Sequence, residues 1–149
     1  MYDRILLPTD AQAGTELAIE HAITVAESHD ADLYLLYVVD SDVYGSYTGD
    51  EYVHEFEGLE SALEQEGEEA LEEIADKARE AGLEPEVEIR HGSPHEQILE
   101  YADEEDIDLL VMGSKERPGE YRRLLGSVTE RVARLASRPV TIVKTPVEE

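Results

Sequence analysis

The sequence predicts an open parallel β-sheet covered by helices on both faces, folded as one domain over residues 1–149. Three observations support this fold class. Short apolar runs suited to buried strands alternate with longer segments in which apolar residues recur every three or four positions, as on a helix. The chain has the length of one domain, and it shows no internal repeat. Strands joined by helical crossovers pair in parallel with right-handed connections, so this alternation gives an α/β sheet.

The expected elements follow in chain order. Five strands are expected at residues 4–8, 33–39, 86–89, 107–112 and 140–143, and four helices at residues 17–26, 56–81, 94–103 and 128–136. The first two strands are nearly continuous apolar runs, which is typical of strands buried on both faces. Residues 86–89 alternate polar with apolar, which indicates a strand nearer the sheet edge. The second helix is long and acidic; Gly82 is placed to cap its C-terminus, with Pro85 just beyond.

Acidic residues dominate the composition. The chain has 37 Asp and Glu against 12 Lys and Arg, a formal net charge of −25, with no cysteine and only three lysines. Such charge repels nucleic acid, so we expect no nucleic-acid partner. Without cysteine, a signal-like N-terminus or a long apolar run, we expect a cytoplasmic protein with no disulfide and no membrane association. The acidic surface is typical of a halophilic protein, and predicts greater stability in molar KCl than in dilute buffer.

Positive charge is concentrated in one segment. Seven of the twelve basic residues lie between Val111 and Arg138, together with glycines and hydroxyls, where a strand is expected to end and the last helix to begin. Glycine permits close backbone approach, and a helix start offers unpaired N–H groups and the positive end of its dipole. The segment therefore predicts an anion site, with phosphate as the expected anion. Ligands of open α/β sheets sit beyond the carboxyl ends of the strands, here the exits at residues 8–10 and 112–114.

Four segments, in this order and spacing, resemble the universal stress protein family along essentially the whole chain. They are residues 5–10, residues 91–94 with 98–99, residues 108–114 and residues 125–132. The resemblance implies a Rossmann-like fold of the adenine nucleotide alpha hydrolase type, with strand order 3-2-1-4-5. It also implies a homodimer in which residues 139–143 pair across a two-fold axis, as exposed edge strands can. Other protein partners are compatible with the family.

The family's ATP-binding members carry a glycine, two residues, a second glycine, nine residues, and then glycine followed by serine or threonine. Gly113 and Gly126-Ser127 stand at the matching ends, whereas Glu116 replaces the middle glycine. By resemblance, Asp10 contacts the ribose or adenine side of a nucleotide. The candidate nucleotide-binding residues are Pro8, Thr9, Asp10, Val38, Met112, Gly113, Ser114, Gly126, Ser127 and Val128.

Two of these residues also have a purely structural interpretation. Ser127, with Glu130 three residues later, forms the pattern of a capping box, in which each side chain satisfies a backbone N–H at the helix start. Asp10 equally suits a turn at the end of a strand. Neither structural role excludes ligand binding.

Glu116 separates two functional interpretations. A carboxylate about 4 Å from a phosphate oxygen costs roughly 4 kcal/mol at an effective dielectric of 20. In the first interpretation the loop tolerates Glu116, and the protein is a regulatory module that binds ATP or AMP, with Mg²⁺ where the phosphates need it. AMP, which carries fewer charges, is tolerated better than ATP. In the second, Glu116 disables the phosphate loop, and the protein is a dimeric interaction protein that binds no nucleotide.

Enzyme signatures are missing from the sequence. It contains no GxxxxGK[ST] phosphate loop, no GxGxxG fingerprint, no HExxH and no GxSxG. We therefore expect a protein that is not an enzyme, with slow ATP hydrolysis as the upper limit.

The expected loop at 40–55 holds three tyrosines, and it is long enough to cover a bound base or contact a partner.

Overall fold

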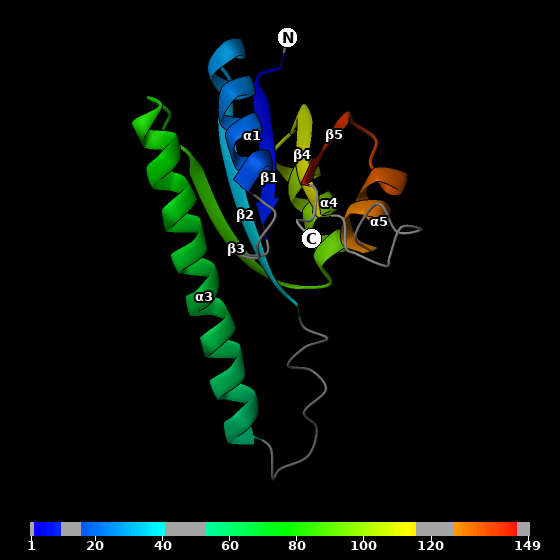
Figure 1. Cartoon of the computed structure of the whole chain (residues 1–149). Coiled ribbons are helices and arrows are strands. Elements are labelled where there is room, and N and C mark those ends of the chain that lie inside the picture. The colour runs from blue at the N-terminus through cyan, green and yellow to red at the C-terminus, as the bar shows by residue number, and fades with distance from the viewer. Residues whose placement is uncertain (1, 10–15, 41–52, 116–126, 146–149) are drawn as a thin grey trace.

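The computed structural model of the chain describes residues 2–9, 16–40, 53–115 and 127–145. Strands and helices alternate along these residues (Figure 1): β1 (Arg4–Thr9), α1 (Glu16–His29), β2 (Asp32–Asp40), α3 (Val53–Glu80), β3 (Glu86–Gly92), α4 (Pro94–Glu104), β4 (Leu109–Lys115), α5 (Ser127–Leu135) and β5 (Val140–Thr145). Every element expected from the sequence is present, and all boundaries agree with the expected ones within three residues.

Two of these small differences have local reasons. β3 continues to Gly92 because it stays paired with β2 as far as the pair Asp40↔Gly92, beyond the end of its polar–apolar alternation. β4 begins two residues later than expected, at Leu109. Ile107 belongs to the turn that leaves α4: its N–H donates to the Ala102 carbonyl at 2.9 Å, and it is buried there.

The five strands form one parallel sheet in the order β3-β2-β1-β4-β5, as the family resemblance implied. β1 pairs with β2 over six residues, from Arg4↔Asp32 to Thr9↔Tyr37. Its pairing with β4 covers only Ile5↔Leu109 and Leu6↔Leu110. β1 and β4 therefore separate toward their carboxyl ends, at the point where the strand order reverses.

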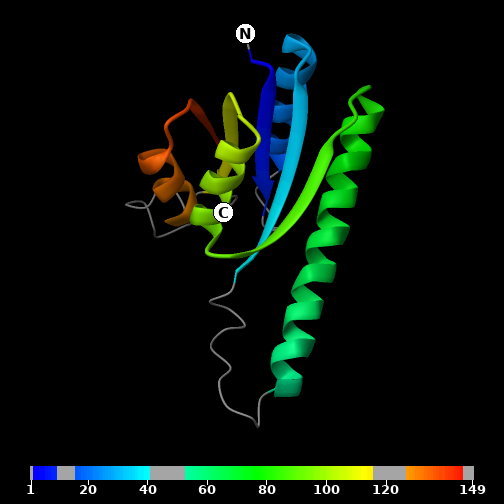
Figure 2. The same ribbon diagram turned by 180° about the vertical axis from the view of Figure 1, so that it is seen from behind.

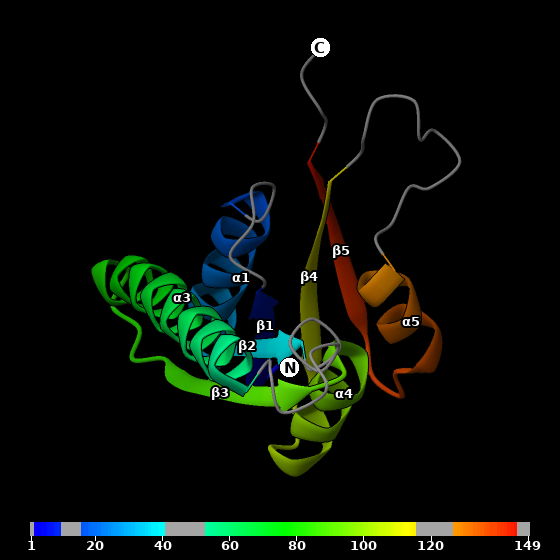
Figure 3. The same ribbon diagram turned by 90° about the horizontal axis from the view of Figure 1, so that it is seen from below.

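Helices cover both faces of this sheet. α1 and α3 lie on one face, and α4 and α5 on the other (Figures 2 and 3). Successive side chains of β1 are buried on alternate faces of the sheet. Ile5 and Leu7 belong to the core beneath α1 and α3, whereas Leu6 belongs to the core beneath α4 and α5. This double burial explains why β1 is a continuous apolar run in the sequence.

The longest helix, α3, starts beyond the carboxyl ends of the strands and runs back along the sheet (Figures 1 and 2). It ends as the sequence predicted, with Gly82 in the left-handed region at φ +88°. The Leu83 N–H donates to the Ala78 carbonyl at 3.0 Å, which is typical of a glycine-capped C-terminus.

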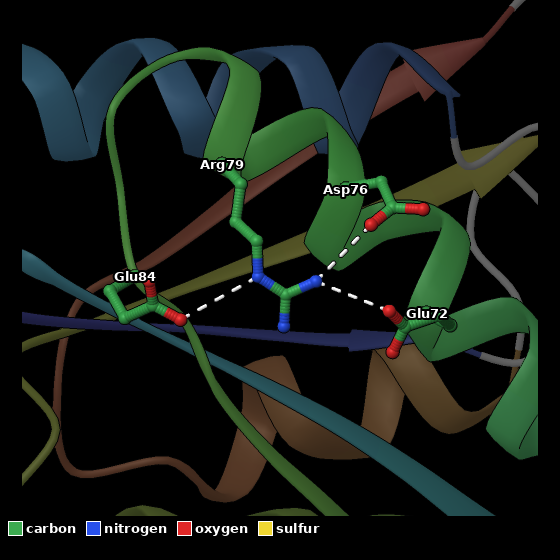
Figure 4. Close-up of polar contacts among 4 residues, drawn as sticks. All are labelled: Glu72, Asp76, Arg79 and Glu84. Carbon is green, nitrogen blue, oxygen red and sulfur yellow. Dashed lines mark hydrogen bonds and ion pairs between the residues drawn. The ribbon is translucent and has the colours of Figure 1, made fainter.

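Arg79 joins this helix end to the following loop. Its guanidinium lies 3.2 Å from Glu72 and from Asp76 within the helix, and 3.5 Å from Glu84 beyond it (Figure 4). The carboxylates are largely exposed, so each pair contributes little to stability.

None of the helices in the described part of the chain is long and apolar enough to cross a bilayer.

Candidate functional site

A pocket of about 340 Å³ lies at the carboxyl ends of β1, β2 and β4. This volume falls within the range of small-molecule sites in proteins. Pro8 and Thr9 line it from β1, and Met112 and Gly113 from β4. These are the ends of the two strands that stop pairing after Leu6 and Leu110. The pocket therefore occupies the place where open α/β sheets bind ligands.

The structure brings most of the candidate residues together. Six of the ten line this pocket, namely Pro8, Thr9, Val38, Met112, Gly113 and Val128. Ser114 lies on β4 just beyond Gly113 and is buried. Ser127 begins α5, but its side chain, like Asp10 and Gly126, lies outside the described residues. The role of each residue in binding stays a prediction.

A hydrogen bond joins the end of β4 to the start of α5. The Thr129 hydroxyl donates to the Gly113 carbonyl at 3.2 Å, and the Thr129 side chain is buried. This contact places the first turn of α5 on the pocket wall, where Val128 and Thr129 both contribute to the lining. The first turn of α5, whose N–H groups have no acceptor within the helix, and the positive end of the helix dipole thus lie beside the pocket. The sequence reasoning missed Thr129, since it treated the segment only as a phosphate loop and a cap.

The predicted capping box at the start of α5 stays a prediction, because it depends on the Ser127 side chain. On the Glu130 side, Oε1 accepts a hydrogen bond from the Arg134 guanidinium at 2.7 Å. This i,i+4 pair lies on the exposed face of α5. At least one Glu130 oxygen therefore faces along the helix toward its C-terminus, and away from the helix start.

A second helix of the same face also begins at the pocket. Pro94, the first residue of α4, and Ile98, one turn later, both line it. Proline suits a first helical position because the N–H that it lacks would have no partner there. Ile98 is buried and belongs, with Leu36 and Met112, to the core beneath α4 and α5. This side of the pocket is therefore apolar.

The opposite wall comes from β2 and α3, and the sequence did not predict the part played by α3. Tyr37, Val39 and Asp40 contribute from β2, and Leu63 and Glu66 from α3. Glu66 lies in an acidic stretch of α3 and is exposed, as expected for a solvated helix face. Two carboxylates, Asp40 and Glu66, are among the residues that line the pocket.

Close packing holds α3 against β2 beside this wall. A Cβ atom on Gly67 would lie 2.4 Å from Cδ1 of the Tyr37 ring, so only glycine permits this approach. His91 on β3 adds a polar contact, with its Nε2 3.0 Å from the Glu64 carboxylate. A glycine in the middle of a helix costs about 1 kcal/mol relative to alanine, so Gly67 itself was the sequence signal for a packing constraint.

Shifted pKa values are found at a cluster between β3 and α4. Burial raises the pKa of Tyr101 above its ordinary value, and burial raises that of Tyr34, whose ring meets Tyr101 edge to face. The Arg90 guanidinium lies 4.8 Å from the Tyr101 ring centre, and it pairs with Glu88 and Glu104. This arrangement anchors the edge strand β3 to α4.

Within the described ranges, no three His, Asp or Glu side chains converge on a metal position.

Comparison with known proteins identifies relatives over the whole chain. The profile of the universal stress protein family matches residues 1–144. A universal stress protein of Methanocaldococcus jannaschii is 38% identical over 149 residues, which is 100% of this chain and 86% of that protein. The solved structure of a second protein from this family in the same organism superimposes with a TM-score of 0.84 at 30% identity, over 99% of each chain.

Two solved structures with bound nucleotides share the fold. A universal stress protein in complex with cAMP superimposes with a TM-score of 0.64 at 26% identity, over 97% of this chain and 98% of that one. A family protein from Arabidopsis thaliana with AMP bound gives a TM-score of 0.70 over 95% of this chain and 91% of that one. The second likeness, at 23% identity, is one of fold alone.

Proposed function

The chain belongs to the universal stress protein family, and on this premise we propose that it is a regulatory module whose pocket binds an adenine nucleotide, ATP or AMP. The observation that carries the proposal is the pocket at the strand-order reversal, which is lined by candidate residues from β1, β2, β4 and α5. A solved relative in complex with cAMP supports the same class of ligand.

The chemistry of the lining suits the two ends of a nucleotide. Val38, Ile98 and Met112 offer apolar surface for a base. The start of α5, tied to Gly113 by the Thr129 hydroxyl, offers backbone N–H groups and a positive dipole end for phosphate. AMP is the better ligand in this proposal, because Glu116 opposes each added phosphate charge. Where ATP binds, Mg²⁺ neutralises part of that repulsion. We propose that binding, rather than turnover, is the function, with slow ATP hydrolysis as the upper limit.

Calorimetric titration of ATP, ADP and AMP with Mg²⁺, in molar KCl, tests the proposal. The matched variants are Val128→Asp, which puts a carboxylate on the pocket wall, and Ala133→Asp, which puts one on an exposed position of the same helix. An Asp in the first turn favours the helix dipole, so Val128→Asp spares the helix itself. We expect it to weaken AMP binding at least tenfold through repulsion of the phosphate, with Ala133→Asp close to wild type. Absence of heat with all three nucleotides on the folded protein overturns the proposal.

The edge strand β5 supports a second proposal that needs no nucleotide. Among the strands that the structure describes, β5 pairs with β4 alone, and Val140, Ile142 and Val143 are half-buried. We propose that β5 pairs with its copy in a homodimer, which covers this edge. If no nucleotide binds, association through this surface is the remaining function of the protein. Sedimentation at micromolar concentration in molar KCl tests it, and a monomer there contradicts the dimer.

A further inference from the structure

The part of α3 that lines the pocket packs less tightly on the core than the later turns of the helix. It lies toward the end of α3 that extends beyond the carboxyl ends of the strands (Figures 1 and 2). Leu63 and Glu66 contribute to the lining, but Leu63 is only half-buried and Glu66 is exposed. Leu71, Ile74 and Ala78, on the later turns, are buried in the core. Apolar burial therefore holds the pocket-lining turn less firmly than the rest of α3.

A histidine of the edge strand β3 contacts this turn through two carboxylates. The Nε2 atom of His91 lies 3.0 Å from Oε1 of Glu64, and its Nδ1 atom lies 3.8 Å from Oε1 of Glu60. Glu60 and Glu64 are one helical turn apart, a spacing at which like charges repel each other. A carboxylate only accepts hydrogen bonds, so the Nε2–H group of His91 donates to Glu64. The contact therefore joins β3 to the segment of α3 that carries Leu63 and Glu66.

The preceding residue of β3 makes a comparable contact on the other side of the sheet. The Arg90 guanidinium pairs with Glu104 and lies 4.8 Å from the ring centre of Tyr101, both of them on α4. Glu104 is the last residue of α4, whereas Pro94, its first residue, lines the pocket. Neighbouring side chains of β3 thus anchor two helices, α3 at its pocket-lining turn and α4 at the end remote from the pocket.

We propose that His91 is a positioning residue for the pocket, which holds the wall formed by Leu63 and Glu66 in place through the Glu64 and Glu60 carboxylates. A ligand that meets a preformed wall does not have to order it, so binding costs less conformational entropy. This inference rests on the proposed nucleotide function and deepens it. It assigns the fixed position of one wall to β3, although no described residue of β3 lines the pocket itself.

Three variants of neighbouring positions test the role of His91. His91→Val removes the imidazole and keeps a residue that suits a strand. It should weaken AMP binding about three- to fivefold, because the ligand then has to order the α3 turn as it binds. His91→Arg still offers donors to both carboxylates, and should bind AMP within about twofold of wild type. The matched control is Arg90→Gln, which removes the charged contact with the far end of α4 and should lower stability while AMP affinity stays within about twofold of wild type.

Two measurements on the full chain, at a fixed KCl concentration, show whether the effect passes through α3. In His91→Val without ligand, the amide protons of residues 63–66 should exchange faster than in wild type. Calorimetric titration of AMP should show that Glu64→Gln and His91→Val together cost less affinity than the sum of the two single changes, because both residues act through one contact.

Each contrary outcome has a distinct meaning. Equal AMP affinity in wild type and His91→Val overturns the inference and leaves the proposed function standing. Weaker AMP binding with unchanged amide exchange places His91 against the ligand itself, and also overturns it. An equal loss of AMP affinity in Arg90→Gln makes the effect a general loosening of β3, which overturns it as well. No binding of AMP to the wild-type protein removes the proposed function and this inference together.

Discussion

Replacing Gly67 with alanine tests whether the packing of α3 on β2 sets one wall of the pocket. The added Cβ would lie 2.4, 2.7 and 2.9 Å from three carbons of the Tyr37 ring, about 1 Å inside ordinary contact distance. Tyr37 is 6% exposed, so its ring has little room to retreat on the core side, while its other side borders the pocket. We therefore expect either the ring to move into the pocket or α3 to lift from β2.

The magnitude follows from two opposing effects. Overpacking of this kind costs about 1–3 kcal/mol, and alanine gains about 1 kcal/mol over glycine in a helix interior. Gly58→Ala on the same helix is the matched control, because a Cβ at that position would meet nothing within 4 Å, and it should gain the helix term alone. The two variants should therefore differ in unfolding free energy by the overpacking cost, about 1–3 kcal/mol, with Gly67→Ala the less stable.

Urea unfolding at a fixed KCl concentration measures this difference. AMP titration measures the effect on the pocket, where only Gly67→Ala should weaken binding. Adding Tyr37→Ala to Gly67→Ala should cost less stability than the sum of the two single changes, since it removes Cγ, Cδ1 and Cε1, the three carbons that clash. The double-mutant cycle should show coupling above about 0.5 kcal/mol. If Gly67→Ala is stabilised as much as Gly58→Ala, the close approach of α3 to Tyr37 does not exist and the reasoning fails.

Three further predictions concern charge. Glu116→Gly should tighten ATP binding at least tenfold while changing AMP binding less, as measured by calorimetry, because it removes a carboxylate from the phosphate loop; equal ATP affinities would contradict the repulsion argument. Because burial raises the pKa of Tyr101, the folded state opposes its ionisation, so stability should hold below about pH 10 and fall as the pH rises toward the folded-state pKa. Tyr101→Phe should reduce that alkaline loss in unfolding experiments between pH 8 and 11, and an unchanged slope would count against it. Finally, thermal unfolding should occur at higher temperature in molar KCl than in dilute buffer, because salt screens the repulsion within a chain of charge −25; equal melting temperatures would refute halophilic adaptation.

The sequence was sufficient to predict the elements because local patterns determine them. The apolar run of β1 indicates burial on both faces of the sheet, and Gly82 indicates the end of α3. The strand order came from the family resemblance, since periodicity contains no information on which strands become neighbours. Tertiary contacts decided what was missed. Glu66 looks like any exposed helical glutamate until α3 is placed against β2, and Thr129 acquires its role only when α5 meets the end of β4.

The amino edge of the sheet has a consequence for what a bound molecule can do. There, the Asp108 carboxylate accepts hydrogen bonds from the N–H groups of Asp3 and Arg4 at 2.8 and 2.9 Å, and beyond them β1 and β4 share only two residue pairs. The sheet thus consists of two groups of strands, β3-β2-β1 and β4-β5, whose backbones pair with each other near the amino ends of β1 and β4 and separate toward the carboxyl ends. A molecule in the pocket would contact both groups of strands where no backbone pairing joins them, so we expect it to resist their relative rotation. We therefore expect occupancy of the pocket to restrict the orientation of the outer strand β5, without any change in secondary structure.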